Sequence, residues 1–93
     1  MSFPAPTVTI YTTESCIYCV RAKEFLRDRS VPFSEVDVTG DADARASLIE
    51  RSSGRRTVPQ IFVGEVQVGG YTDLVALDAE GRFQPLLVAS REE

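Results

Sequence analysis

Cys16 and Cys19, separated by two residues, are the only cysteines in a chain that contains no histidine. At this spacing two thiols lie about one helical turn apart on one helix face, so a disulfide between them can form and open without a large backbone movement. A β-branched segment, Thr7–Thr12, precedes the pair, and apolar residues at helical spacing follow it. This order puts Cys16 at the N-terminus of a helix, where free N–H groups and the helix dipole favour a thiolate. Cys16 is therefore predicted to be a nucleophile.

Three other roles for the cysteine pair stay open on these residues alone. A structural zinc ion usually takes four Cys or His ligands, and this chain has two cysteines and no histidine. A structural disulfide adds little stability when it closes so short a loop. Two buried, unreactive cysteines are the third alternative. Because a Cys-x-x-Cys pair in a strand–helix setting is typical of thioredoxin-like redox proteins, redox chemistry is the favoured interpretation.

Length and charge narrow the class of protein. Ninety-three residues suit a single domain, residues 1–93. With 10 basic and 14 acidic residues, the formal net charge of −4 argues against nucleic acid or an anionic membrane as the partner. No segment approaches the roughly 20 apolar residues of a membrane helix, and the first residues lack the pattern of a signal peptide. We therefore expect a cytoplasmic location, where a cysteine pair is more often catalytic than structural.

The elements that must position the pair alternate between strands and helices. Strands are predicted at about Thr7–Thr12, Phe33–Val38, Gln60–Val63 and Val66–Val68, and helices at about Cys16–Arg29, Asp43–Arg51, Thr72 to just before Gly81, and Phe83–Ala89. Thr72 is expected to be the N-cap of the third helix. The first strand, helix and second strand form a right-handed crossover with parallel strands, and the last two strands form a hairpin. The order βαβαββαα predicts an α/β fold with a four-stranded mixed sheet flanked by helices.

Four motifs follow one another along the chain: Tyr11-Thr12, Cys16-x-Tyr18-Cys19, Thr57-Val58-Pro59 and Gly69-Gly70-Tyr71-Thr72-Asp73. Together they resemble the glutaredoxins, thioredoxin-fold enzymes that use glutathione. The resemblance runs over about residues 7–88 and includes the Leu-x-x-Leu-Asp…Gly…Leu-Leu pattern with which small bacterial dithiol glutaredoxins end. It implies the thioredoxin fold for this chain.

The resemblance also implies roles for the residues of the second motif. Cys16 matches the nucleophile that attacks a disulfide or a glutathione mixed disulfide. Cys19 matches the resolving cysteine, which displaces the target from Cys16. Tyr18 matches an aromatic residue beside the pair that contacts glutathione, and its alternative role is to cover the start of the helix.

The third and fourth motifs match the glutathione site of the family. Thr57 precedes Val58 and Pro59, and Pro59 matches a cis-proline that leaves the backbone of Val58 free to pair with glutathione. Thr72 and Asp73 match the site of the γ-glutamyl end. The first N–H groups of the third helix would hold its α-carboxylate, and the aspartate side chain would take its α-ammonium. An ordinary helix N-cap is the alternative for these two residues.

The resemblance to the family also includes positions that would affect how closely glutathione approaches the backbone and which charges surround it. Gly70 would let the ligand approach the backbone closely, or would simply form a turn. Ile17 stands where many glutaredoxins have proline, and non-proline residues here accompany iron–sulfur cluster binding more often than proline does. Thr13 stands where the family often has a lysine near the glycyl carboxylate. Arg55 and Arg56 are candidates to supply the missing positive charge, with a solvated surface role as the alternative.

The resemblance implies a glutathione-dependent oxidoreductase that reduces protein disulfides and glutathionylated proteins, as a monomer that uses glutathione as co-substrate and holds no metal. The alternative is a carrier in which two chains and two glutathiones hold a [2Fe–2S] cluster through Cys16. A third possibility is a glutaredoxin-shaped protein recycled by thioredoxin reductase, against which Thr72 and Asp73 argue.

Overall fold

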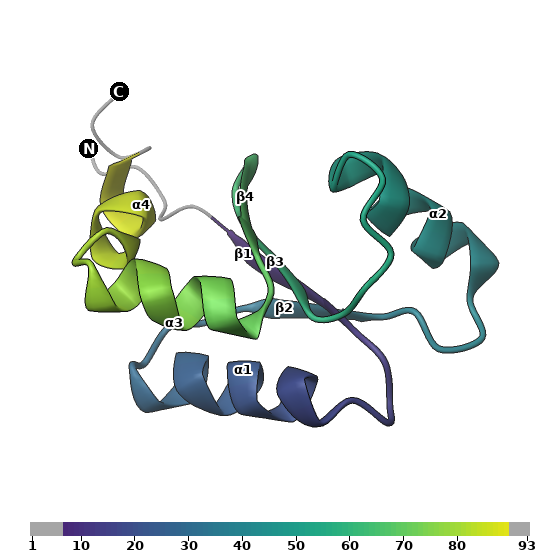
Figure 1. Cartoon of the computed structure of the whole chain (residues 1–93), viewed down its shortest axis with the longest axis horizontal. Helices are drawn as coiled ribbons and strands as arrows, with labels where there is room; N and C mark the ends of the chain where they lie inside the picture. Colours follow the sequence, from purple (N-terminus) through teal and green to yellow (C-terminus); the bar gives the residue numbers. More distant parts are fainter. Residues whose placement is uncertain (1–6, 90–93) are drawn as a thin grey trace.

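A computed structural model describes residues 7–89 of the chain. Within this range, four strands and four helices follow in the predicted order (Figure 1): β1 (Val8–Thr12), α1 (Ile17–Asp28), β2 (Ser34–Asp37), α2 (Ala42–Arg51), β3 (Gln60–Val63), β4 (Val66–Gly69), α3 (Tyr71–Ala79) and α4 (Phe83–Ala89). None of the helices in residues 7–89 is both long enough and apolar enough to span a bilayer.

The strands form one mixed sheet in the order β2-β1-β3-β4. β1 pairs with β2 in parallel and with β3 in antiparallel orientation, and β3 pairs with β4 in antiparallel orientation. The parallel pair is joined through α1, as a crossover connection requires, while the antiparallel pair is joined by the short turn at Gly64 and Glu65. The predicted α/β architecture, a thioredoxin fold with a four-stranded mixed sheet, is confirmed.

Helices cover both faces of this sheet, and each face has its own apolar core (Figure 1). Successive strand residues point to opposite faces, so Ile10 and Tyr11 of β1 enter different cores. The core with Ile10 contains residues from α1, α3 and α4, among them Leu26 and Leu74, both fully buried. The core with Tyr11 contains Leu48 of α2. Helix α1 is thereby held against the sheet on the face that it shares with α3.

The ends of α1 and α3 lie near the positions predicted for them, with one error. Cys16 and Arg29, the predicted ends of the first helix, are its N-cap and C-cap. The prediction that Thr72 caps the third helix was wrong, because α3 begins at Tyr71 and Gly70 is its N-cap. Gly70 has no side chain to cap the helix, but its own N–H is satisfied by the side chain of Asp73, so the first turn forms one residue earlier than predicted.

Candidate active site

The cysteine pair lies at the start of α1, just after the loop that follows β1. The two cysteines form a disulfide, and their Cα atoms are 5.1 Å apart. Cys16 has an extended backbone conformation, and its Sγ accepts a hydrogen bond from the backbone N–H of Cys19 at 3.0 Å. In the reduced protein the same N–H and the positive end of the helix dipole would face a Cys16 thiolate. The helix start therefore favours negative charge on Cys16.

Burial separates the roles of the two sulfurs. Cys16 is half-buried, whereas Cys19 is only 1% exposed. The sulfur of Cys16 also lies 3.7 Å from the carbonyl oxygen of Val58, on the loop that precedes β3. A sulfur of a partner molecule can thus meet Cys16 beside the backbone of Val58, while Cys19 is accessible chiefly to Cys16.

A groove of about 220 Å³ lies beside the pair and brings together residues from segments distant in the sequence. Its lining comes from the start of α1, the loop before β3, and the start of α3: Tyr18, Arg55, Thr57, Val58, Pro59, Gly70, Tyr71, Thr72 and Asp73. The Val58–Pro59 peptide bond is cis. Seven residues that the sequence predicts for glutathione binding therefore line one groove.

Opposite charges meet at the α3 end of this groove. The Oδ2 atom of Asp73 accepts a hydrogen bond from the Gly70 N–H at 2.9 Å and lies 3.7 Å from Nη2 of Arg55. Both side chains are about half exposed, at 47% for Arg55 and 51% for Asp73, so either can exchange its present partner for a charged ligand group. Gly69 has a φ of 110°, and a Cβ there would collide with the Asp73 carboxyl, which explains glycine at that position.

Two predicted binding residues lie outside the groove lining, and one lining residue, Tyr71, was not predicted from the sequence. Thr13 and Arg56 do not line the groove, whereas Arg55 does. Tyr71 was missed, although its ring lies beside that of Tyr18 with centroids 6.0 Å apart. An aromatic residue directly after a Gly-Gly pair at a helix start was the available signal. Roles for Thr13 and Arg56 in ligand binding stay predictions.

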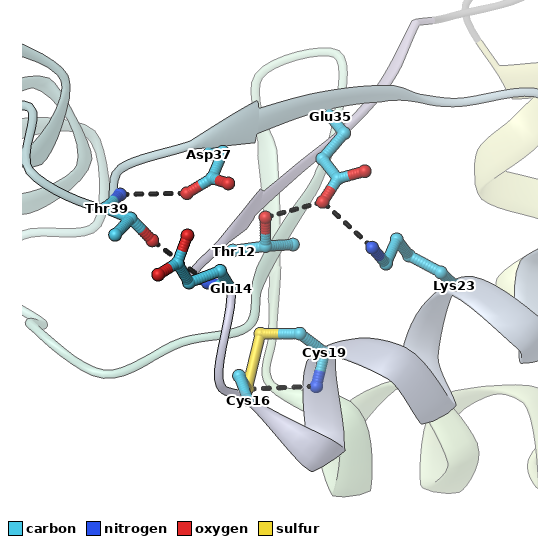
Figure 2. Close-up of polar contacts among 8 residues, drawn as sticks. All are labelled: Thr12, Glu14, Cys16, Cys19, Lys23, Glu35, Asp37 and Thr39. Carbon is cyan, nitrogen blue, oxygen red and sulfur yellow. Dashed lines mark hydrogen bonds and ion pairs between the residues drawn. A yellow bond between two sulfur atoms is a disulfide. The ribbon is translucent and has the colours of Figure 1, made fainter.

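A polar cluster on the sheet side of α1, which the sequence analysis missed, ties three elements together (Figure 2). Thr12 at the end of β1 donates its hydroxyl to Oε2 of Glu35 in β2 at 2.7 Å, and Nζ of Lys23 in α1 lies 2.9 Å from the same oxygen. The hydrogen bond from Thr12, followed by that from Lys23, lowers the pKa of Glu35. Lys23 comes one helical turn after Cys19, so this cluster holds the helix turn that carries Cys19.

A second set of contacts fixes the loop that leads into Cys16 (Figure 2). The backbone N–H of Glu14 donates to the Thr39 hydroxyl at 2.9 Å, and the backbone N–H of Thr39 donates to Oδ1 of Asp37 at 2.8 Å. The hydrogen bonds from Thr39 lower the pKa of Asp37. The loop before the nucleophile is thereby anchored to the segment that follows β2.

We expect Thr12→Val to destabilise the fold by roughly 1 kcal/mol at neutral pH, since it removes a buried hydroxyl that donates to a carboxylate. The folded-state pKa of Glu35 lies below its ordinary 4.5, so its contribution is present above that value and is lost as the pH falls through the folded-state pKa. Thermal unfolding of the unaltered protein and of Thr12→Val, at about pH 7 and at about pH 3, measures the difference in their stability at each pH. A stability difference that is equally large at both pH values would contradict the predicted role of the Glu35 charge.

The fold and the site together define the class of protein to which this chain belongs. A cysteine pair at a helix N-terminus, one sulfur accessible and the other buried, next to a cis-proline on a mixed sheet, is the arrangement of a thioredoxin-fold protein that exchanges thiols and disulfides.

Comparison with known proteins agrees with this class. The glutaredoxin family model matches residues 8–68. Glutaredoxin 3 of Escherichia coli K12 is 51% identical over 80 residues, which are 86% of this chain and 95% of the relative. A glutaredoxin of Pseudomonas aeruginosa is 48% identical over 84 residues, 90% of this chain and 99% of the relative. The solution structure of a Brucella melitensis glutaredoxin has a TM-score of 0.77 at 47% identity and covers 89% of both chains.

The chain therefore belongs to the glutaredoxin family, and Cys16 and Cys19 are the redox pair of a thiol–disulfide oxidoreductase. It is a small glutaredoxin of the bacterial type, since the matched residues make up most of this chain and nearly all of the two bacterial relatives named above.

The iron–sulfur alternative needs ligands that one chain does not bring together. Within residues 7–89, no group of three or more His, Cys, Asp or Glu side chains is arranged to hold a metal ion. A cluster takes about four thiolates, and here a single chain offers one accessible sulfur, that of Cys16. The residues of one chain do not fit a cluster by themselves, and a cluster shared with a second chain and glutathione stays a prediction from Ile17.

Proposed function

We propose that this protein is a glutathione-dependent oxidoreductase that reduces protein disulfides and glutathione mixed disulfides. The observation that carries the proposal is the groove beside Cys16, which ends in the paired charges of Arg55 and Asp73 and in the free N–H groups of α3. Glutathione is a small peptide with a thiol at its centre, two carboxylates and one ammonium group. The groove offers a partner for each of these groups within reach of one reactive sulfur.

The charges of the groove favour one orientation of glutathione. The α-carboxylate of its γ-glutamyl end would bind the first N–H groups of α3, near Thr72, where the helix dipole favours an anion. The α-ammonium would bind the carboxylate of Asp73 and displace Arg55 from it. The backbone of Val58 would pair with the peptide backbone of glutathione, which brings the glutathione sulfur toward Cys16.

The proposed reaction is a pair of thiol–disulfide exchanges. The Cys16 thiolate attacks one sulfur of a target disulfide, the target S–S bond breaks, and the other target sulfur leaves as a thiolate. The Cys19 thiolate then attacks the sulfur of Cys16, which forms the Cys16–Cys19 disulfide and releases the target as a dithiol that has gained two electrons. Two glutathiones, oxidised to glutathione disulfide, return the two electrons to the cysteine pair.

A comparison of two recycling systems tests the proposal. Disulfide reduction by the protein is coupled either to glutathione with glutathione reductase or to thioredoxin reductase, and NADPH consumption is followed. We expect turnover with the glutathione system and little with thioredoxin reductase. Turnover that depends on thioredoxin reductase alone would overturn the assignment of glutathione as co-substrate.

The proposal extends to the setting in which the protein works. Exchange with glutathione needs a reducing pool, so we infer the cytoplasm as its compartment, with disulfide-containing and glutathionylated proteins as its targets. No step needs a sulfur from a second chain, so we infer a monomer as the working form. Size-exclusion chromatography of the reduced protein with glutathione measures the oligomeric state.

We expect Arg55→Gln to raise the Michaelis constant for glutathione about fivefold, because Arg55 lines the groove and carries a guanidinium that a glutathione carboxylate can bind. The matched change Arg56→Gln removes the same charge one residue away, outside the groove lining, and is expected to alter this constant less than about twofold. The coupled assay at varied glutathione concentration measures both. A larger effect at Arg56 would assign the role to Arg56, the other arginine that the sequence offers as a candidate.

A further inference from the structure

Exposed apolar side chains gather around the nucleophile. Among the described residues, five large apolar side chains are strongly exposed, and three of them lie in the first turn of α1: Ile17 at 60%, Tyr18 at 49% and Val20 at 44%. The other two, Val66 at 48% and Val88 at 44%, lie on β4 and α4. Single exposed apolar residues are ordinary on a protein surface, but three within one turn of a reactive sulfur are a concentrated patch.

Ile17 and Val20 form a stripe of their own within this patch. They are three residues apart and so lie side by side on the helix surface, away from the buried face that carries Cys19 and Leu26. Tyr18 lines the groove, whereas Ile17 and Val20 do not. The stripe therefore borders Cys16 outside the groove proposed for glutathione.

The flanks of the stripe do not select for either sign of charge. The exposed charged residues on the same surface of α1 include both signs equally: Arg21, Glu24, Arg27 and Asp28. The guanidinium of Arg21 lies over the ring of Tyr18, 5.5 Å from its centroid. What the stripe offers a partner is thus apolar area.

We infer that Ile17 and Val20 dock the polypeptide of a target protein and select targets with an apolar residue next to the reactive cysteine. This inference rests on the proposed function, in that it takes protein disulfides as substrates. A target whose sulfur bonds to Cys16 must extend its chain over the residues that surround that sulfur. Ile17 is the next residue along the chain, and Val20 is its neighbour on the helix, so a flanking apolar side chain of the target covers both.

The inference also accounts for the residue that departs from the family pattern. Ile17 is too exposed to serve the core, and glutathione in the groove would leave it uncovered. Covering two aliphatic side chains in the complex with a target favours binding, since each buried CH₂ group contributes on the order of a fourfold gain in affinity. An apolar target residue on the stripe should therefore speed the reaction about tenfold.

The test uses the full-length protein in its reduced form and two synthetic peptides. Each peptide has one internal disulfide closing the same loop, and the two differ only in the residue next to one cysteine, leucine or serine. The second-order rate constant for reduction of each peptide is measured by quenched flow, without glutathione. We expect the unaltered protein to reduce the leucine peptide about tenfold faster than the serine peptide.

The double variant Ile17→Ser/Val20→Ser is expected to bring the ratio of these two rates close to one. Val66→Ser is the control, since the exposure of Val66, 48%, lies between those of Ile17 and Val20 but Val66 is on β4, and this variant should keep the full ratio. Equal rates with the unaltered protein, or an unchanged ratio in the double variant, would overturn the inference. The peptide assay contains no glutathione. A protein that fails to turn over in the separate assay with glutathione and glutathione reductase would therefore contradict the proposed function, but it would not change the ratio of peptide rates measured here.

Discussion

Cys16→Ser is expected to lower disulfide reduction by a factor on the order of a thousand or more, because it removes the sulfur that bonds to the target. Cys16 is the accessible member of the pair, and its Sγ is the atom that the N–H of Cys19 faces. The measurement is turnover of both a protein disulfide and a glutathione mixed disulfide in the glutathione reductase system. Activity that survives this change would remove Cys16 as the nucleophile.

Cys19→Ser is the matched control for this prediction. It should abolish the dithiol reduction of a protein disulfide but keep much of the activity on glutathione mixed disulfides, since a second glutathione can resolve the intermediate on Cys16. Alkylation of the reduced native protein below about pH 8 should label Cys16 rapidly and Cys19, only 1% exposed, hardly at all. Preferential labelling of Cys19 would reverse the two roles.

Asp73→Ala is expected to raise the Michaelis constant for glutathione about tenfold, because it removes the carboxylate proposed to bind the α-ammonium. The same change removes the hydrogen bond that Asp73 accepts from the Gly70 N–H. It should therefore also cost about 1 kcal/mol of stability, a fall of roughly 4–8 °C in the melting temperature.

Asp73→Asn separates the two roles of this side chain. Asparagine keeps an oxygen for the Gly70 N–H but has no charge, so it should retain most of the thermal stability and still show the raised Michaelis constant. Coupled kinetics and thermal unfolding of both variants give the two quantities. A normal Michaelis constant in Asp73→Asn would show that Asp73 is only a helix cap.

The order of the elements was largely predictable because the local signals agree with one another. The first strand is a β-branched run, Val31-Pro32 follows the end of the first helix, and Gly64-Glu65 marks the hairpin turn. The N-cap of α3 was predicted wrongly for a local reason as well. Thr72 has a good capping side chain, but the carboxyl of Asp73 satisfies the Gly70 N–H and moves the helix start forward.

The chemistry of the site was determined by the sequence, since it depends on residue types at short spacing. A Cys-x-x-Cys pair between a strand and a helix gives two sulfurs within bonding distance, one of them at the helix N-terminus, whatever surrounds them. The likeness of the later motifs to the glutaredoxins then indicated the groove.

Only the tertiary structure decided which charged side chains pair in that groove and which contacts anchor α1, the helix that carries the cysteine pair. Arg55 rather than Arg56 reaches Asp73, because neighbouring residues in a loop point in different directions that packing alone fixes. The cluster of Thr12, Lys23 and Glu35 joins two strands and a helix, so no local pattern predicts it. Spacing along a chain fixes contacts within one element, whereas contacts between elements depend on how sheet and helices pack.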